Sequence, residues 1–263
     1  MAKITKIEVQ KRSGRYNVYL DGKYAFPVAE SVLIQFNLMK GTELTTDQVK
    51  QIEAADQQAK AYAKMLDYLS YQPRTTADVV KKLKEIETPV EYIEPIIAKL
   101  QANKFLDDQA YAEVYVRTEM ITGTKGPGVI RQKLRLKKVS DEEIEAALMQ
   151  FTPELQAENA AKLAEKLFRR YQSQPERRRE QKVRQGLITK GYSPEIYDQI
   201  KEQVEPVSDQ DQEAELLATT AEKQWRHYHR YQGYQRIQRF KQSMYRKGFD
   251  LDAVQRWLDE QES

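Results

Sequence analysis

Four copies of one apolar pattern run through the 263-residue chain, and they constrain its fold more than any other feature. Apolar residues recur four positions before an anchor residue and ten and thirteen positions after it. The anchors lie 51, 53 and 57 residues apart, at Leu83, Leu134, Leu187 and Met244. A period of this length predicts helical units that stack on one another, and such a repeat makes an extended surface before it makes an active site.

The spacing of the apolar positions predicts three helices in each repeat. The predicted repeats cover residues 47–104, 105–151, 153–205 and 208–263, and the first has helices at 50–71, 75–86 and 89–103. Helix-capping residues stand where each third helix should begin. They are Thr88 with Glu91, Ser140 with Glu143, Ser193 with Pro194, and Asp250. The segment from Val204 to Ser208 is the predicted hinge.

The first 46 residues follow a different pattern. Apolar residues alternate with polar ones at 16–20 and at 24–28, on either side of Asp21-Gly22. Alternation with period two around Asp-Gly predicts a β-hairpin. A third strand is predicted at residues 4–10 and a helix at residues 29–37. The predicted fold class is mainly α, with tandem three-helix repeats forming a curved elongated array and a small N-terminal β-rich module at residues 1–46.

Composition limits the function. The chain is 40% hydrophobic and 32% charged with a mean hydropathy of -0.79, which suits a thin repeat-built body better than one compact globule. It has no cysteine, so disulfides and thiolate metal sites are excluded. The N-terminus lacks an apolar signal segment, and no stretch approaches the roughly 20 apolar residues of a membrane span. We therefore expect a cytoplasmic monomer without a membrane partner.

Charge is segregated along the chain although its net value is only +3. Residues 223–247 carry eight Lys or Arg and no Asp or Glu, and residues 162–191 carry ten basic and three acidic residues. Segregation of this kind favours an acidic partner more strongly than the overall charge does.

The basic residues fall mainly on the predicted second helix of each repeat, and four such helices would form a basic stripe. Lys and Arg bind phosphates or carboxylates through Coulomb attraction and counterion release. The candidate contacts to an acidic partner are Arg74, Lys81, Lys82, Arg131, Lys133, Arg135, Lys138, Arg177, Arg178, Arg236 and Arg239. For one helix alone, pairing with the acidic third helix is the simpler explanation. For four helices in register, a binding surface is favoured.

Two features bear on the kind of nucleic acid. The predicted third helices are acidic, so they are unsuited to reading a major groove, and sequence-specific duplex recognition is disfavoured. Aromatic residues alternate with basic ones between Trp225 and Arg236, which would suit stacking of single-stranded bases. However, Trp225, Tyr228 and Tyr231 follow helical spacing, so a core stripe is the simpler interpretation.

No pattern typical of an enzyme is present. His227 and His229 would point about 200° apart on a helix, so they make a poor metal site. The segment Gly123–Gly128 lacks the order of a phosphate-binding loop and predicts a loop that starts a helix. Asp107 and Asp108 are better explained by a helix N-terminus than by a magnesium site. We expect no catalytic residue, no cofactor and no metal.

Three motifs carry a more specific signal. They are Arg74-Thr75-Thr76-Ala77-Asp78-Val79-Val80-Lys81-Lys82-Leu83; Leu100 with Lys104-Phe105-Leu106-Asp107-Asp108, Tyr111-Ala112 and Tyr115-Val116-Arg117; and Gly126-Pro127 with Ile130. In order and spacing they resemble the RecX family of recombinase regulators over about residues 60–150, and the later repeats resemble its longer members. One departure is Glu87, where repeats three and four have Gly191 and Gly248, so a left-handed helix end is less favourable there.

The resemblance implies a non-enzymatic regulator in recombination, DNA repair and the SOS response. RecX-like proteins bind the groove of the RecA filament on single-stranded DNA and inhibit its ATP hydrolysis, strand exchange and coprotease activity. Single-stranded or duplex DNA is a further possible partner of the basic stripe. We expect four residues to join repeats one and two: Asp107, Tyr111, Tyr115 and Arg117. The alternative function is a repeat protein that binds nucleic acid directly, without a recombinase; a pure scaffold is a third.

Overall fold

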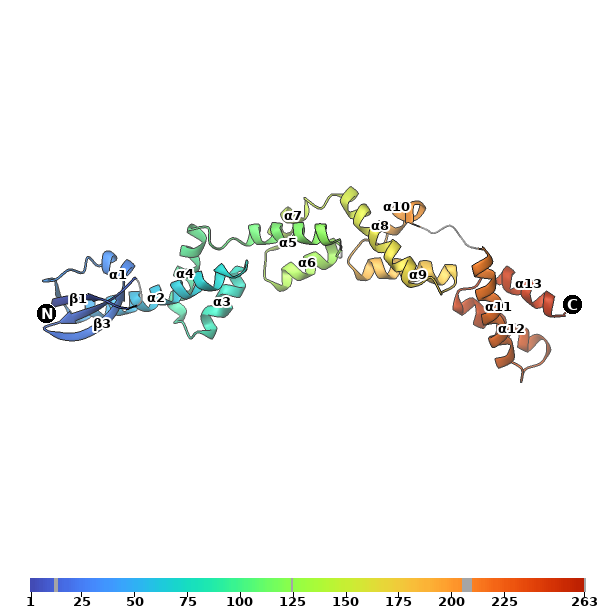
Figure 1. The fold of residues 1–263 in the computed structure, drawn as a ribbon, viewed down its shortest axis with the longest axis horizontal. Coiled ribbons are helices and arrows are strands. Elements are labelled where there is room, and N and C mark those ends of the chain that lie inside the picture. The colour runs from blue at the N-terminus through green and yellow to red at the C-terminus, as the bar shows by residue number, and fades with distance from the viewer. Residues whose placement is uncertain (12–13, 124, 205–209, 263) are drawn as a thin grey trace. The chain divides into compact units, whose positions relative to one another are not determined.

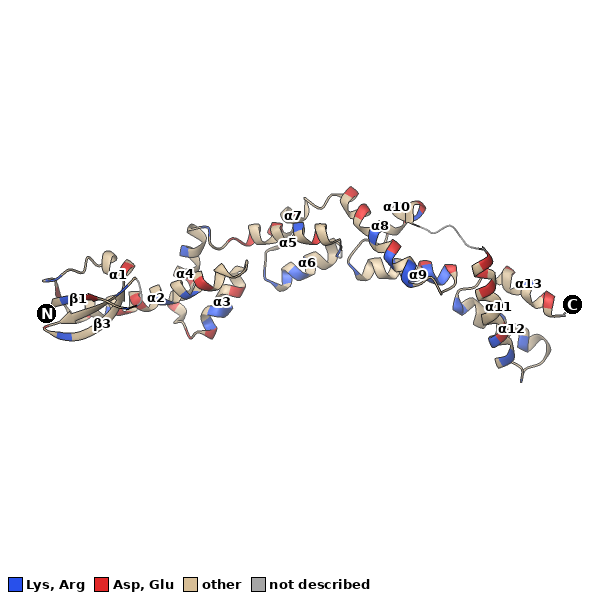
Figure 2. Ribbon diagram, viewed as in Figure 1, with Lys and Arg blue, Asp and Glu red and all other residues tan. Residues whose placement is uncertain are grey.

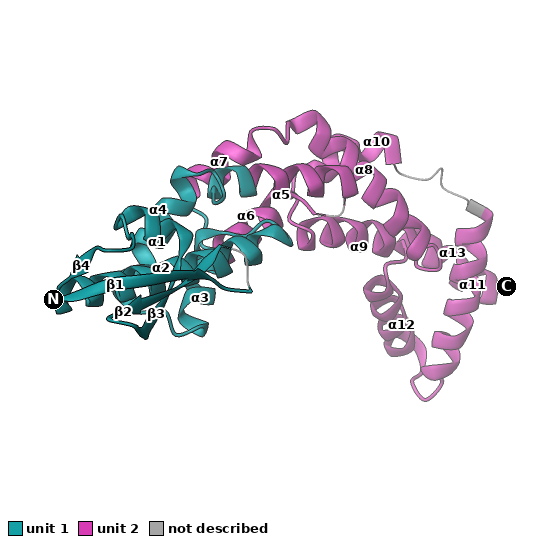
Figure 3. Cartoon of the chain, turned by 60° about the vertical axis from the view of Figure 1, so that its left-hand side comes forward, with its two compact units in different colours: residues 1–111, 137–140 teal, residues 112–136, 141–263 magenta. Residues whose placement is uncertain are grey.

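The computed structural model describes residues 1–11, 14–123, 125–204 and 210–262. Within these residues the chain has thirteen helices and four strands, in two compact units (Figures 1 and 3). Unit 1 comprises residues 1–111 and 137–140, and unit 2 comprises residues 112–136 and 141–263.

A four-stranded antiparallel sheet opens unit 1. Its strands are β1 (Ala2–Val9), β2 (Arg15–Leu20), β3 (Lys23–Ala29) and β4 (Glu43–Leu44), and they lie in the order β3-β2-β1-β4. The predicted third strand is confirmed as β1, and the predicted helix as α1 (Glu30–Gln35). The sequence pattern missed β4, because two residues are too short to show alternation.

The predicted hairpin joins β2 to β3. Leu20 pairs with Lys23 across the turn, and Asp21 and Gly22 take φ angles of 49° and 81°. Two successive positive φ angles are typical of the type I′ turn that Asp-Gly favours, and its twist matches that of the strands.

The remaining helices follow in groups of three, as the repeat predicted. They are α2 (Thr46–Ser70), α3 (Thr76–Glu85) and α4 (Val90–Ala102); α5 (Asp108–Thr122), α6 (Pro127–Leu136) and α7 (Asp141–Leu148); α8 (Pro153–Arg170), α9 (Glu176–Thr189) and α10 (Ile196–Val204); and α11 (Gln210–His227), α12 (Gly233–Lys247) and α13 (Leu251–Glu262). The prediction of a mainly helical chain with a small N-terminal sheet is therefore confirmed.

The repeat pattern is a core pattern. All sixteen residues that define it are buried, with exposed fractions between 0% and 9%. The second helix of each repeat supplies the anchor and the residue four positions before it, and the third helix supplies the other two. Since burying one large apolar side chain contributes roughly 2 kcal/mol, these positions alone account for the pairing of second and third helices.

A residue with a left-handed backbone lies four positions after each anchor. The four are Glu87, Lys138, Gly191 and Gly248, with φ angles of 56°, 62°, 88° and 102°. We call this position the corner of the repeat. Glu87 thus adopts the conformation that its side chain disfavours. The Thr88 N–H donates to the anchor carbonyl of Leu83 at 3.0 Å, and this closing bond helps to offset a cost of about 1 kcal/mol.

The predicted caps of the third helices are partly confirmed. Asp250 accepts a hydrogen bond from the Ala253 N–H at 2.9 Å and caps α13, and α7 begins directly after Ser140. The prediction for Thr88 is wrong, because Pro89 is the N-cap of α4 and no side chain caps it.

The predicted start of the third helix in repeat three is also wrong. A turn in which the Ile196 N–H donates to the Ser193 carbonyl precedes α10, which begins at Ile196 instead of Pro194. Of the predicted hinge, residues 205–208 lie outside the described part of the chain.

Repeats two and three interlock through glycines in unit 2. The N–H groups of Gly126 and Gly128, before and in the first turn of α6, donate to the carbonyls of Lys190 and Gly191 at 2.7 and 2.9 Å. A Cβ atom on Gly191 would lie 2.3 Å from the Val129 nitrogen. The corner of repeat three therefore fits against the start of α6 only because it has no side chain.

Replacing Gly191 with alanine should destabilise this junction. The variant Gly233→Ala is the matched control, because Gly233 also has a positive φ, of 51°, but no atom would lie within 4 Å of its Cβ. We expect about 1 kcal/mol of loss in the control from left-handed strain and roughly 3 kcal/mol in Gly191→Ala, where backbone must also move. Hydrogen exchange of the α6 and α9 amides would measure it; equal losses would contradict the interlock.

Asp56 joins α2 to the sheet. Its buried carboxylate accepts hydrogen bonds from the Ala29 N–H at 2.8 Å and from Arg15 at 2.9 Å, and Lys60 Nζ lies at 2.9 Å. Burial alone would raise the pKa of Asp56, but the bonds from Arg15, Lys60 and Ala29 together hold that pKa below its ordinary value. The carboxylate is therefore charged in the folded state.

The substitution Asp56→Asn should cost roughly 3 kcal/mol, because it leaves the charge of the half-buried Arg15 uncompensated. The folded pKa is lower than the unfolded value of about 3.9, so this stabilisation is full above that pH and is lost as the pH falls through the folded pKa. Hydrogen exchange of β2 and β3 amides at about pH 7 should show the loss. Urea unfolding should show the wild-type advantage shrinking below about pH 4. The control Asp47→Asn changes an exposed carboxylate of the same helix and should cost under about 0.5 kcal/mol.

Candidate anion-binding surface

Nine of the eleven candidate residues lie on the second helices α3, α6, α9 and α12, whereas Arg74 precedes α3 and Lys138 follows α6 (Figure 2). On each of these helices, the side that carries the anchor faces the core of its own repeat. The Lys and Arg side chains on the other sides of the helix lie outside that core. Their partners differ from site to site, and these partners decide which cations have charge available for a ligand.

In α6 the arginines are paired with carboxylates of the third helix. Arg131 donates to both Glu145 oxygens at 2.6 and 3.0 Å, and Arg135 donates to Asp141 at 2.7 Å. The Arg131 hydrogen bond holds the pKa of Glu145 below its ordinary value. Arg131 and Arg135 are therefore paired with the acidic third helix, which is the simpler of the two explanations for their charge. Lys133 lies between them and is exposed.

Repeat three contains the same ion pair at the equivalent positions. Arg184 of α9 donates to Asp198 of α10 at 2.6 Å, and the two residues are fourteen apart, as are Arg131 and Glu145. An ion pair at one place in two repeats points to a structural role, since it ties the second helix to the third.

The α12 arginines pack on aromatic rings. The half-buried Arg236 lies 3.7 Å from the Trp225 ring centre and donates to the Trp225 carbonyl at 2.8 Å. Arg239 lies 4.4 Å from the Tyr231 ring centre and is exposed. Trp225 and Tyr228 pack against the core of the last repeat, which confirms the simpler interpretation for these two residues of the aromatic stripe.

In unit 1 two of the four candidates line a partly apolar hollow. Arg74 lies over the Tyr68 ring at 4.5 Å, and Lys82 pairs with Glu85 at 3.2 Å. Lys81 and Lys138 are exposed and line a cavity of about 880 Å³. These last two are the unit 1 candidates best placed to meet an anion.

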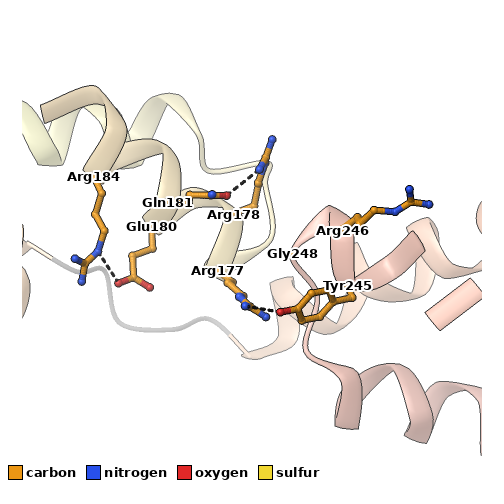
Figure 4. A pocket seen from close by; sticks show the side chains of 8 residues that line it. All are labelled: Arg177, Arg178, Glu180, Gln181, Arg184, Tyr245, Arg246 and Gly248. Carbon is orange, nitrogen blue, oxygen red and sulfur yellow. Dashed lines mark hydrogen bonds and ion pairs between the residues drawn. The ribbon is translucent and has the colours of Figure 1, made fainter. Parts of the chain in front are cut away.

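Arg177 and Arg178, in the first turn of α9, differ from the paired arginines. Arg177 donates to the Tyr245 hydroxyl at 2.9 Å and lies 4.6 Å from that ring centre (Figure 4). Arg178 donates to Gln181 Oε1 at 2.8 Å. Both acceptors are neutral, so these bonds orient the guanidinium groups without cancelling their charge.

Contacts within repeat two are described for two of the four residues predicted to join repeats one and two. Asp107 caps the start of α5 by accepting from the Ala110 N–H at 2.9 Å, and the Tyr115 ring lies 5.7 Å from Lys125 in its own repeat. Arg117 is exposed. Asp108 links the two repeats, because its carboxylate accepts the Thr76 N–H at 2.8 Å.

The segment resembling a phosphate loop is a repeat junction. Its Gly126 and Gly128 N–H groups are engaged by repeat three, and α6 begins at Pro127, so it is the loop that starts a helix. Over the described ranges, no three His, Asp or Glu side chains converge as metal ligands. A membrane-spanning helix is likewise missing from the described residues.

Sequence reasoning overlooked Tyr245 and Gly248 as possible site residues. Tyr245 follows the buried anchor Met244, and a residue next to a core position on a helix points away from that core. Its partnership with Arg177, 68 residues earlier, has no signal in a single sequence.

Family models describing RecX match most of the chain. The regulatory protein RecX N-terminal domain matches residues 2–45, and the first and second three-helix domains match 61–100 and 107–148. The third three-helix domain matches twice, at 154–200 and at 210–258.

Relatives named regulatory protein RecX align over nearly the whole chain. The one from Limosilactobacillus reuteri (strain DSM 20016) is 66% identical, covering 100% of this chain and 99% of its own. The one from Bacillus subtilis (strain 168) is 39% identical, covering 98% of each. A crystal structure of regulatory protein RecX is similar with a TM-score of 0.73 at 66% identity, covering 77% of this chain and 100% of that one. RecX from Lactobacillus salivarius gives a TM-score of 0.55 at 42% identity, covering 58% and 99%.

Proposed function

The chain belongs to the RecX family of regulatory proteins, and from this premise we propose that it regulates a RecA recombinase. In this proposal it binds the filament groove on single-stranded DNA and inhibits ATP hydrolysis, strand exchange and coprotease activity. The observation that carries the proposal is the 66% identity to a regulatory protein RecX over the full length. No catalytic step is assigned to the chain.

The ion pairs and ring contacts of the basic residues reduce the set of candidates that could contact the filament groove. A filament groove offers phosphates and carboxylates, and both require cations whose charge is still available. Arg131 and Arg135 are tied to α7 carboxylates, and Arg236 packs on Trp225, so these three serve the fold first. The exposed cations retained as contacts are Lys81, Lys133, Lys138, Arg177, Arg178 and Arg239. The exposed Lys84 is added to them, because it lines the same cavity as Lys81.

Titration of this protein into single-stranded-DNA-dependent ATP hydrolysis by the cognate RecA tests the proposal. With DNA in large excess over both proteins, we expect inhibition at a small fraction of the RecA concentration, which competition for DNA does not produce. Without inhibition, a mobility shift of single-stranded DNA by the protein alone would favour the alternative, a nucleic-acid-binding repeat protein without a recombinase partner.

Charge reversal at exposed lysines tests the surface. The variant Lys81→Glu/Lys84→Glu/Lys133→Glu should keep its fold, because all three side chains are exposed, and should need a roughly tenfold higher concentration for half-inhibition. The control Lys11→Glu/Lys23→Glu/Lys40→Glu makes the same charge change at exposed residues of the N-terminal module. Equal effects in the two variants would show that only net charge matters. Reversal of Arg131 and Arg135 is a poorer test, since it would also break their ion pairs.

A further inference from the structure

The two repeat junctions within unit 2 are built differently. Repeats two and three share two backbone hydrogen bonds, from Gly126 and Gly128 to the corner of repeat three. At the equivalent place, Gly248 in the corner of repeat four lies against Arg178, where a Cβ atom would be 2.8 Å from Arg178 Cβ. There side chains take the place of the backbone acceptors: Arg177 donates to the Tyr245 hydroxyl, and the Glu176 N–H donates to the Glu213 carboxylate at 3.2 Å.

This side-chain link leaves a hollow of about 460 Å³. Figure 4 shows Arg177 meeting Tyr245 between α9 and α12, with Arg178 and Arg246 extending away from them and Gly248 nearby. Two different repeats therefore supply its cations, and the corner glycine keeps one wall free of side chain.

The charge of the hollow is positive. Glu180, the carboxylate in its lining, lies 3.4 Å from Arg184 and 3.7 Å from Lys201, so its charge is matched from its own repeat. Arg177 and Arg178 bond to the neutral Tyr245 hydroxyl and to Gln181, and Arg246 is exposed. An arginine held by a neutral acceptor is oriented before a ligand arrives, while its charge is still available to that ligand.

We propose that this hollow is a phosphate-binding site that takes the backbone of a single-stranded nucleic acid and joins repeats three and four through it. Arg177, Arg178 and Arg246 bind the phosphates. The Tyr245 ring, which is 45% exposed, offers a face on which an unpaired base stacks. The single strand is favoured over a duplex because duplex bases are already stacked inside the helix. The site deepens the proposed function, since a recombinase filament presents such a strand, but its chemistry needs no recombinase.

Direct binding without recombinase tests the site. The probe is a fluorescein-labelled oligodeoxythymidylate, with anisotropy measured across a salt series. For Arg177→Gln/Arg178→Gln we expect roughly tenfold weaker binding and a log–log salt slope shallower by about 1.4, or 0.7 for each cation lost. The control Arg169→Gln/Arg170→Gln removes two exposed arginines from α8 of the same repeat. Equal weakening in both variants would overturn the proposal.

A second variant separates stacking from charge. Tyr245→Leu should bind oligodeoxythymidylate several-fold more weakly, yet bind an abasic oligonucleotide of the same length within about twofold of wild type. Equal losses on both probes would remove the base from the site. Because Tyr245 and both arginines are exposed, thermal unfolding midpoints of all variants should stay near wild type. Tyr245→Phe keeps the ring, so it should retain the oligodeoxythymidylate binding that Tyr245→Leu loses.

Two competitors distinguish the sources of the anion. Displacement of the oligonucleotide by thymidine monophosphate at micromolar concentration would assign the site to free nucleotides and would contradict the proposal that it binds a polynucleotide. Polyglutamate that binds as tightly as the oligonucleotide, and equally in Tyr245→Leu, would assign it to an acidic protein segment. If the wild type inhibits RecA but the arginine and tyrosine variants bind the oligonucleotide as tightly as the wild type, the site alone is overturned. If these variants lose binding but the wild type does not inhibit RecA, the proposed function alone is overturned.

Discussion

The turn between the second and third helix of each repeat is the constraint on which the rest of the helical chain depends. There the backbone is left-handed, at Glu87, Lys138, Gly191 and Gly248. This turn brings the apolar residues of two short helices into one core, and helices of this length are marginal without such packing. In repeats two and four the same turn or the residue beside it also meets the preceding repeat: Lys137 Nζ contacts Asp78 at 3.0 Å, and Gly248 lies on Arg178. The same left-handed turn thus helps to form the core of its own repeat and the contact with the preceding repeat.

Charge compensation separates the arginines that build the fold from those that remain available. Arg131 and Arg184 stand at equivalent positions and reach equivalent carboxylates, so their charges are used within the repeat. Arg177 and Arg178 reach neutral oxygens instead. A count of basic residues treats all four alike, although the field that a partner meets depends on the second kind only.

Much of the fold could be predicted from the sequence, because the period of apolar residues is a direct record of which side of each helix is buried. Leu83 and Leu187 illustrate this, as does the Asp21-Gly22 hairpin, whose turn chemistry is local. The site was less accessible. Whether Arg135 meets Asp141 and Arg177 meets Tyr245 depends on side-chain geometry across elements, which spacing does not encode. The cap predicted at Thr88 failed because α4 begins at Val90, with Pro89 at the N-cap position.

The corner glycines have a consequence for how such chains change length. At both junctions within unit 2, the corner of one repeat packs against the start of the second helix of the preceding repeat. The two surfaces in such a contact differ, so the contact is heterologous and has a direction. Because the two sides of such a contact differ, a further unit can be added at one end without altering the contacts already present. The third three-helix domain model matches twice in this chain, as expected if one unit had been duplicated whole. At the start of α12, Tyr234 is 76% exposed and no atom would lie within 4 Å of a Cβ atom on Gly233, so no corner packs there within the described residues.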